Sequence, residues 1–295
     1  MDVTSQVIDA INGWLQSLAT HLLKPALAAA DQLLFQTPTF DSIPEVGRSW
    51  ALVRDVADGL FVLALLIAGI TVMASGAIES RYSAKALIPR ILFAAIAANA
   101  SLALCGGLIK LNNAIVSGVL GPNPGSNTFG QLASMVQVQQ TSDQVVGSLV
   151  GLAAAVLAIL LVGLYIGRDI VLLVATVLSP LALATYALPQ TDEIARTWWR
   201  VFSALLFVQV VQALLVEIGI ELLHHTDWLG GPMSDLVSGL VLVTLLFLLF
   251  KLPFAAYHWA FHHPLSHSPV VQSAVTATKV VVTAAKVAAA AVAVA

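Results

Sequence analysis

The chain has 295 residues, of which 59% are hydrophobic and only 10% are charged, against about 25% charged residues in an average soluble domain. Thirteen Lys and Arg stand against sixteen Asp and Glu, which leaves a formal net charge of −3. These figures exclude an ordinary cytosolic protein, a disordered chain and a nucleic-acid-binding protein that works through a basic face. The single cysteine, Cys105, allows neither an internal disulfide nor a cysteine metal cluster.

The N-terminal residues predict an amphipathic helix that ends near Pro25. Polar residues fall mostly on one side of this helix. The apolar positions recur at helical spacing and are Val7, Ile8, Ile11, Trp14, Leu15, Leu18 and Leu22. Two placements are open for such a helix. It lies either on the membrane or a partner subunit, or it packs over the bundle of the same chain.

Long apolar segments after this region predict membrane-spanning helices. About 20 apolar residues cross roughly 30 Å of hydrocarbon at about 1.5 Å per residue, and the backbone inside lipid must bond to itself. The segments are Gly59–Ile78, Ile91–Ile109, Val145–Gly167, Ile170–Leu188, Val201–Val216 with a continuation to Leu223, and Leu236–Phe250. The sequence therefore predicts an all-α, polytopic membrane protein.

Basic residues orient these segments, because short loops rich in Lys and Arg stay in the cytoplasm. The loop after the first span holds Arg81, Lys85 and Arg90, so we place it inside. The segment 111–146 has no Lys or Arg, so we place it outside. The third span then returns to the cytoplasm at Arg168.

The segment Ile170–Leu188 allows two topologies. If it crosses, the protein has six spans and the loop with Arg196 and Arg200 lies outside. If it dips in and returns, the protein has five spans and one re-entrant hairpin, and both arginines lie inside. Ser179 and Pro180 supply a helix break where such a hairpin would turn. We favour the hairpin, with the N-terminus outside and the C-terminus in the cytoplasm, because it satisfies the positive-inside rule at every short loop.

These segments divide the chain into three parts. Residues 1–55 form an N-terminal amphipathic or peripheral region, residues 56–257 a transmembrane helical domain, and residues 258–295 a C-terminal cytoplasmic helix or tail. The last part begins with His258 and His262, which have the spacing of a helical metal pair but lack the intervening Glu of a zinc protease helix. We interpret them as a polar collar at the membrane and expect no metal and no cofactor.

Polar residues within the spans have two interpretations. They are Asn99 in the second span and Gln209, Gln212, Glu217 and Glu221 in the fifth. Either the fifth span lines a polar cavity or a subunit interface, or its glutamines bond to neighbouring helices while its glutamates reach the interface. A charged side chain at mid-membrane costs at least about 2.5 kcal/mol, so the depth of the two glutamates bears on the choice between these interpretations. Asn99 is expected to make a packing hydrogen bond.

Two glycine pairs have the spacing that lets a neighbouring helix approach closely. Gly147 and Gly151 form one pair, and Gly163 and Gly167 form the other. The spacing predicts a packing face but does not say whether the neighbour belongs to the same chain or to another subunit.

The sequence carries no motif typical of an enzyme. It has no Walker loop, no dinucleotide fingerprint and no Gly-x-Ser-x-Gly elbow, and the spans hold too few acid, base or nucleophile groups to converge on a substrate. We therefore expect a protein that is not an enzyme. A stand-alone transporter or channel for small solutes is an alternative function, although paired half-helices in two matching halves do not occur.

One stretch resembles a known family. Residues Gly167–Leu223 read GRDIVLLVATVLSPLALATYALPQTDEIARTWWRVFSALLFVQVVQALLVEIGIELL. This stretch resembles TrbL-type polytopic subunits of conjugative type IV secretion systems. The matching features are an apolar segment with a central Pro180, a second proline at Pro189, a loop with acidic and basic residues, and then Trp198-Trp199-Arg200. The likeness is greatest to the actinobacterial or Gram-positive branch.

This resemblance implies a plasma (inner) membrane subunit with no chemistry of its own, which helps to form the translocation channel or its membrane platform. It implies membrane lipids, other secretion-system subunits including ATPases, and further copies of the chain as partners, with transient contact with translocating DNA or protein. By the same resemblance, Pro180, Pro189, Trp198, Trp199 and Arg200 shape the re-entrant region and its loop. Arg196 and Arg200 then contact lipid phosphates, ATPases or DNA, or simply anchor the loop.

Overall fold

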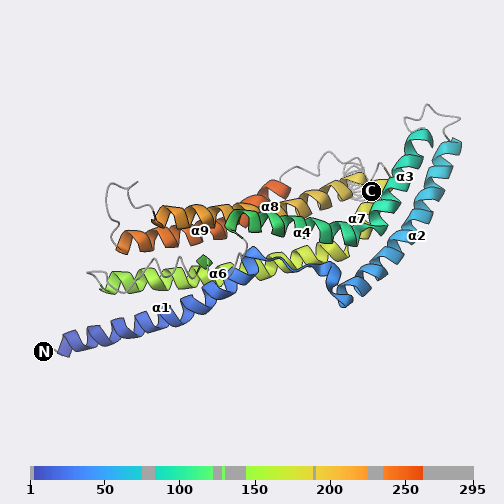
Figure 1. The fold of residues 1–295 in the computed structure, drawn as a ribbon. Coiled ribbons are helices and arrows are strands. Elements are labelled where there is room, and N and C mark those ends of the chain that lie inside the picture. The colour runs from blue at the N-terminus through green and yellow to red at the C-terminus, as the bar shows by residue number, and fades with distance from the viewer. Residues whose placement is uncertain are drawn as a thin grey trace, which may run out of the picture. The chain divides into compact units, whose positions relative to one another are not determined.

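A computed structural model describes residues 3–74, 84–121, 128–129, 144–188, 191–224 and 235–261. All regular elements in these ranges are helices (Figure 1), which confirms the predicted all-α membrane protein. The helices are α1 (Val3–Phe35), η1 (Phe40–Ser42), α2 (Pro44–Ala74), α3 (Ala84–Asn99), α4 (Ser101–Leu120), α6 (Gln144–Val177), α7 (Ser179–Ala184), η2 (Thr185–Ala187), α8 (Asp192–His224) and α9 (Asp235–Phe261).

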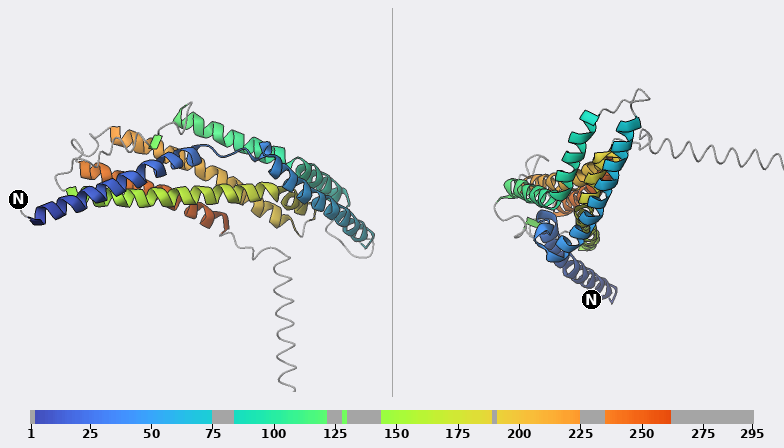
Figure 2. Two further views of the ribbon diagram at one scale, coloured as in Figure 1. Left: turned by 90° about the horizontal axis from the view of Figure 1, so that it is seen from below. Right: turned by 90° about the vertical axis from the view of Figure 1, so that its right-hand side faces the viewer.

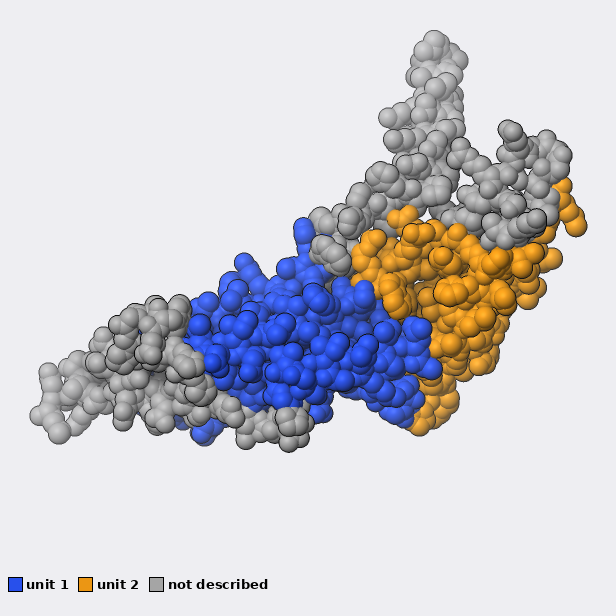
Figure 3. Space-filling view, turned by 45° about the horizontal axis from the view of Figure 1, so that its top comes forward, with its two compact units in different colours: residues 1–43, 103–175, 202–258 blue, residues 44–102, 176–201, 259–295 orange. Residues whose placement is uncertain are grey.

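The chain folds into two compact units, coloured in Figure 3. Unit 1 comprises residues 1–43, 103–175 and 202–258, and unit 2 comprises residues 44–102, 176–201 and 259–295. Unit 1 thus holds α1 and most of α4, α6, α8 and α9. Unit 2 is built from the segment that leads into α4 and the segment that connects α6 with α8.

Unit 1 is a bundle in which α1, α6 and α9 run in one direction and α4 and α8 in the other (Figures 1 and 2). Its apolar core includes Leu27 and Leu34 from α1, Leu161 from α6 and Leu246 from α9. The part of α1 after Pro25 therefore packs within the bundle of its own chain, whereas Ile11 and Trp14 of the predicted amphipathic segment are exposed, and the placement of that segment stays a prediction. Helix α1 continues through Pro25 to Phe35, because burial of the apolar residues beyond the proline offsets the lost backbone hydrogen bond.

In unit 2, α2, α3 and α7 pack on one another around a core made largely of alanines, whose small side chains let helices approach closely. Arg90 of α3 fixes the segment after α7. Its Nε donates to the carbonyl oxygen of Tyr186 at 2.6 Å, and its Nη2 donates to Asp192 Oδ2 at 2.7 Å. The guanidinium also lies 4.4 Å from the ring centroid of Tyr186, at a distance typical of cation–π contacts.

Four helices in the described residues are long and apolar enough to cross a membrane. They are Ser101–Leu120, Gly147–Val177, Asp192–Leu222 and Val237–Ala256, and Ile88–Asn99 is a shorter apolar helix. The two predicted spans nearest the C-terminus lie inside α8 and α9. The predicted span Gly59–Ile78 is the second half of a longer helix, α2, and its last residues lie outside the described ranges.

The predicted span Ile91–Ile109 is not one helix. It is divided between α3, which ends at Asn99, and α4, which begins at Ser101 and continues to Leu120. Polar side chains hold the junction: Asn99 is exposed and donates to the carbonyl oxygen of Ala95 at 3.0 Å and to Asp58 Oδ1 at 3.3 Å, and Ser101 Oγ accepts from Trp50 Nε1 at 2.9 Å. The candidate membrane span in this part of the chain is therefore Ser101–Leu120, which lies further along the chain than the predicted one.

The helix that holds the third predicted span does not end at Arg168. Helix α6 runs without a break from Gln144 to Val177, so the first residues of Ile170–Leu188 extend that helix. The predicted helix break does occur near Pro180, where α7 begins, and the choice between a re-entrant hairpin and a sixth span stays a prediction. The helix continues because the charge of Arg168 is compensated inside the bundle, as described next.

Candidate functional site

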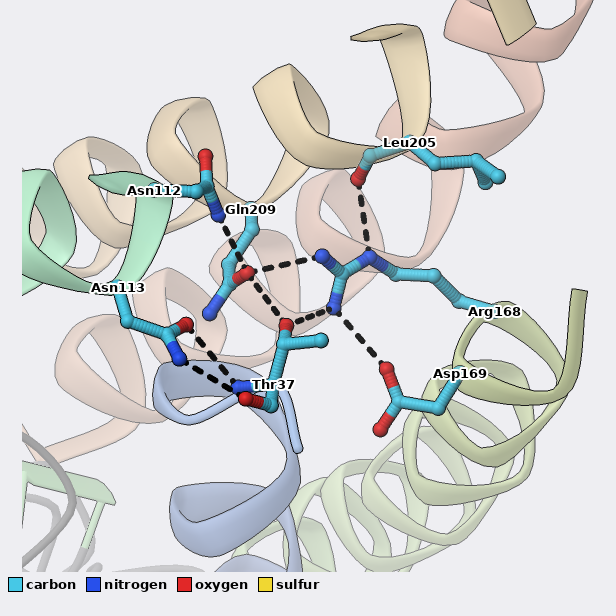
Figure 4. A network of polar contacts seen from close by, with 7 residues as sticks. All are labelled: Thr37, Asn112, Asn113, Arg168, Asp169, Leu205 and Gln209. Atoms are coloured by element: carbon cyan, nitrogen blue, oxygen red, sulfur yellow. Dashed lines mark hydrogen bonds and ion pairs between the residues drawn. The ribbon is translucent and has the colours of Figure 1, made fainter. Parts of the chain in front are cut away.

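The side chain of Arg168 is buried in unit 1, with only 3% of its surface exposed, and Figure 4 shows the polar groups around it. A charge at this depth is costly unless every polar atom around it is satisfied. The guanidinium donates from Nε to the carbonyl oxygen of Leu205 at 3.0 Å, from Nη1 to Thr37 Oγ1 at 3.1 Å and from Nη2 to Gln209 Oε1 at 2.8 Å. Residues from α8 and from the segment after α1 thus surround an arginine of α6.

Thr37 and Gln209 extend these contacts into a network. Thr37 Oγ1 accepts from Arg168 and donates to Gln209 Oε1 at 2.7 Å. Gln209 Oε1 also accepts from Asn112 Nδ2 at 2.7 Å. Asn113 bonds to both backbone groups of Thr37. Its Oδ1 accepts from the Thr37 N–H at 3.2 Å, and its Nδ2 donates to the Thr37 carbonyl oxygen at 2.8 Å. The network therefore joins α4, α6, α8 and the segment after α1 (Figure 4).

Asp169 supplies a partial counter-charge. Its Oδ1 lies 3.3 Å from Arg168 Nη1, and 12% of its side chain is exposed. Each hydrogen bond to a charged group contributes about 1.5–3 kcal/mol, and removing one partner of a buried pair costs about 3–5 kcal/mol because a charge is left uncompensated. The polar groups are directed at one another, so the arrangement orders the bundle.

Within the described residues no group of three His, Cys, Asp or Glu is placed to hold a metal.

The predicted intramembrane polar residues of α8 divide into two sets. Gln209 and Gln212 are fully buried, and Gln212 Nε2 donates to the carbonyl oxygen of Leu249 in α9 at 3.0 Å. Glu217 and Glu221 have exposed side chains. The glutamines therefore bond to other segments of the bundle, whereas the glutamates lie on its surface.

The two glycine pairs of α6 lie in different surroundings. Gly147 and Gly151 are buried, whereas Gly163 and Gly167 are exposed. A Cβ added at Gly163 or Gly167 would have no described atom within 4 Å. The second pair is thus on an open face of α6.

Residues of the predicted loop lie in α7 and in the first turns of α8. Pro180 is buried in α7, and Pro189 lies outside the described residues. Trp198 and Trp199 have ring centroids 6.0 Å apart, and Trp199 is 45% exposed. Trp199 therefore presents an aromatic surface outside the packed core.

The arginines of this region differ in exposure. Arg196 is exposed and donates to Asp192 Oδ2 at 3.1 Å, so it shares this carboxylate with Arg90. Arg200 is half-buried. Unit 2 thus holds two arginines in the first turns of α8, Arg196 and Arg200, and a third, Arg90 of α3, that contacts the start of α8.

Sequence reasoning missed the centre of the network. The sequence pattern favours a membrane boundary at Arg168 and points to no site at Thr37, Asn112 or Asn113. One signal was available: Arg168 and Asp169 are adjacent opposite charges inside an apolar run that extends on both sides. Such residues within a membrane segment usually pair with one another and face the protein interior.

Comparison with known proteins gives an independent result. A family model described as TrbL/VirB6 plasmid conjugal transfer like protein matches residues 1–295. No curated protein and no solved structure matches the chain. Because the family model covers the whole sequence, the chain belongs to the TrbL/VirB6 plasmid conjugal transfer-like family.

Proposed function

We propose that the chain is a non-catalytic subunit of a conjugative type IV secretion system and forms part of the translocation channel or its membrane platform. The family match over residues 1–295 is the observation that carries this proposal. The buried network around Arg168 supports it, because its hydrogen bonds join α4, α6 and α8. An ordered membrane bundle of this kind suits a platform on which other subunits assemble.

We further propose that the N-terminus lies outside and the C-terminus in the cytoplasm. Helices α1 and α9 run in the same direction through unit 1 (Figures 1 and 2), which supports termini on opposite sides. The basic loop with Arg81 and Lys85 sets the cytoplasmic side by the positive-inside rule. The contact of Arg90 with Asp192 supports this orientation, because it keeps the start of α8 close to that basic loop.

The proposed partners are membrane lipids, further copies of this chain, and other secretion-system subunits including ATPases, with transient contact with translocating DNA or protein. Large apolar side chains are exposed on α6, among them Ile159, Ile166 and Ile170, and this surface suits lipid or another membrane helix. Trp199 and Arg196 are exposed at the start of α8 and suit a contact with a cytoplasmic subunit.

A double variant tests the proposal. Replacing Trp199 and Arg200 by Ala is expected to abolish conjugative DNA transfer while membrane insertion stays normal, because the pair lies in the proposed contact region of α8. The control is the double variant Trp14→Ala with Arg48→Ala, which removes the same two side-chain types at exposed positions elsewhere. Normal transfer by the Trp199 and Arg200 variant would contradict the assignment.

Reconstitution distinguishes the alternative function. The purified chain in liposomes is expected to show no solute flux, and the chain extracted from conjugating cells is expected to co-purify with ATPase subunits. Flux of a small solute through liposomes containing this chain alone would favour a stand-alone transporter or channel.

A further inference from the structure

Three polar atoms in the core of unit 1 have no hydrogen-bond partner among the described residues. They are the hydroxyl oxygen of Tyr165, Nε2 of Gln209 and Oε1 of Gln212. All three side chains are 0% exposed. Buried polar atoms in native proteins nearly always have a partner, either in the protein or in ordered water. Three such atoms in one bundle therefore indicate a site for a polar ligand.

Helical register places the three atoms in one region. Arg168 and Gln209 are in direct contact (Figure 4), and α6 and α8 run in opposite directions (Figures 1 and 2). Tyr165 precedes Arg168 by three residues and Gln212 follows Gln209 by three, so each shares a face with its neighbour on the helix. Because the helices are antiparallel, both steps lead in the same direction along the bundle, by roughly one turn of about 5.4 Å.

We propose that this layer between α6 and α8 binds water. Gln209 Nε2 offers two donors, Gln212 Oε1 offers an acceptor, and the Tyr165 hydroxyl both donates and accepts. A water molecule complements this set, since buried water makes about three hydrogen bonds with donors and acceptors mixed. A cation is disfavoured by the donors of Gln209 and by the neighbouring guanidinium of Arg168, and an anion is disfavoured by the acceptor of Gln212.

The proposal gives the membrane domain a hydrated layer next to its buried charge. Bound water there would complete the hydrogen bonding of Tyr165, Gln209 and Gln212. The inference is independent of the proposed role in DNA transfer, because it concerns only contacts within unit 1.

Hydroxyl-radical footprinting by X-ray radiolysis tests it on the full chain in nanodiscs, since radicals form from water bound beside a side chain. Tyr165 is expected to be oxidised at least about tenfold faster than Phe202, an equally buried aromatic residue of the same unit. In the Gln212→Leu variant, the rate at Tyr165 is expected to fall towards that of Phe202. Equal rates at Tyr165 and Phe202 in the unmodified chain would overturn the proposal.

Thermal unfolding of Tyr165→Phe gives a second test that does not depend on Gln212. Removal of a hydroxyl that binds water is expected to leave the unfolding midpoint unchanged or to lower it. Removal of a hydroxyl that is buried without any partner relieves a penalty and raises the midpoint. A raised midpoint would therefore overturn the proposal even if the Gln212 variant fails to fold.

Discussion

The substitution Gln209→Leu is expected to destabilise the bundle strongly. Gln209 Oε1 accepts hydrogen bonds from Arg168, Thr37 and Asn112 at 2.7–2.8 Å, and leucine has a similar size but no acceptor. The lost bond to the guanidinium is worth about 1.5–3 kcal/mol and each of the two neutral bonds about 0.5–1.5 kcal/mol. Together they lower the free energy of unfolding by about 2.5–6 kcal/mol.

Two variants on the same helix control for the change in polarity and size. Gln212→Leu removes one neutral bond within the protein, to the carbonyl oxygen of Leu249, whose loss is expected to cost about 0.5–1.5 kcal/mol. Gln209→Glu keeps an oxygen acceptor for Arg168 and is expected to retain most of the stability. Equilibrium unfolding in mixed detergent micelles measures all three variants. Equal losses for Gln209→Leu and Gln212→Leu would refute the reasoning.

Two further predictions concern other contacts. Arg90→Ala is expected to lower the free energy of unfolding by about 1.5–3 kcal/mol, because a charged hydrogen bond to Asp192 is lost. The double variant that exchanges Arg90 and Asp192 should restore part of this loss in the same unfolding assay. No restoration would argue against the ion pair. Gly106→Ala is expected to cost about 1–3 kcal/mol, because its Cβ would lie 2.6 Å from Cγ and Oδ2 of Asp41. Gly107→Ala meets no described atom within 4 Å and is expected to be neutral or stabilising, so similar losses at both glycines would contradict this packing.

The fold class could be predicted from the sequence because apolar length and composition decide it. Segments such as Val201–Val216 and Leu236–Phe250 have almost no competing signal, and helices α8 and α9 cover them. The break near Pro180 was predicted because proline lacks the backbone N–H that continues a helix, although α1 continues through Pro25, so proline alone does not decide where a helix ends.

The boundaries at Arg168 and Asn99 were not predictable from local pattern. A charged or amide side chain in an apolar run ends a span when it reaches headgroups and stays within the helix when a partner inside the protein satisfies it. At Arg168 the partners are distant in sequence: Thr37 lies 131 residues away and Gln209 lies 41 residues away. Only the tertiary structure brings them together, so the sequence alone favours the simpler interpretation as a boundary.

The polar residues of α8 were identified as a group, but their roles depend on the helix face. Gln209 and Gln212 lie three residues apart and are buried, whereas Glu217 points to the surface. Which face is buried depends on α1 and α9, and the packing of α1 was left open at the sequence level because an amphipathic helix is equally suited to a membrane surface and to a bundle.

The depth of Gly167 in the membrane tests the central claim, that α6 runs unbroken through Arg168 inside the bilayer, most directly. Gly167 is exposed and ten residues before the end of α6 at Val177, so it lies about 15 Å from that end. A spin label at Gly167→Cys, in a chain with Cys105→Ala, is expected to be accessible to oxygen and shielded from a water-soluble nickel reagent. Ready access of the nickel reagent would place Gly167 at the membrane boundary and contradict the account.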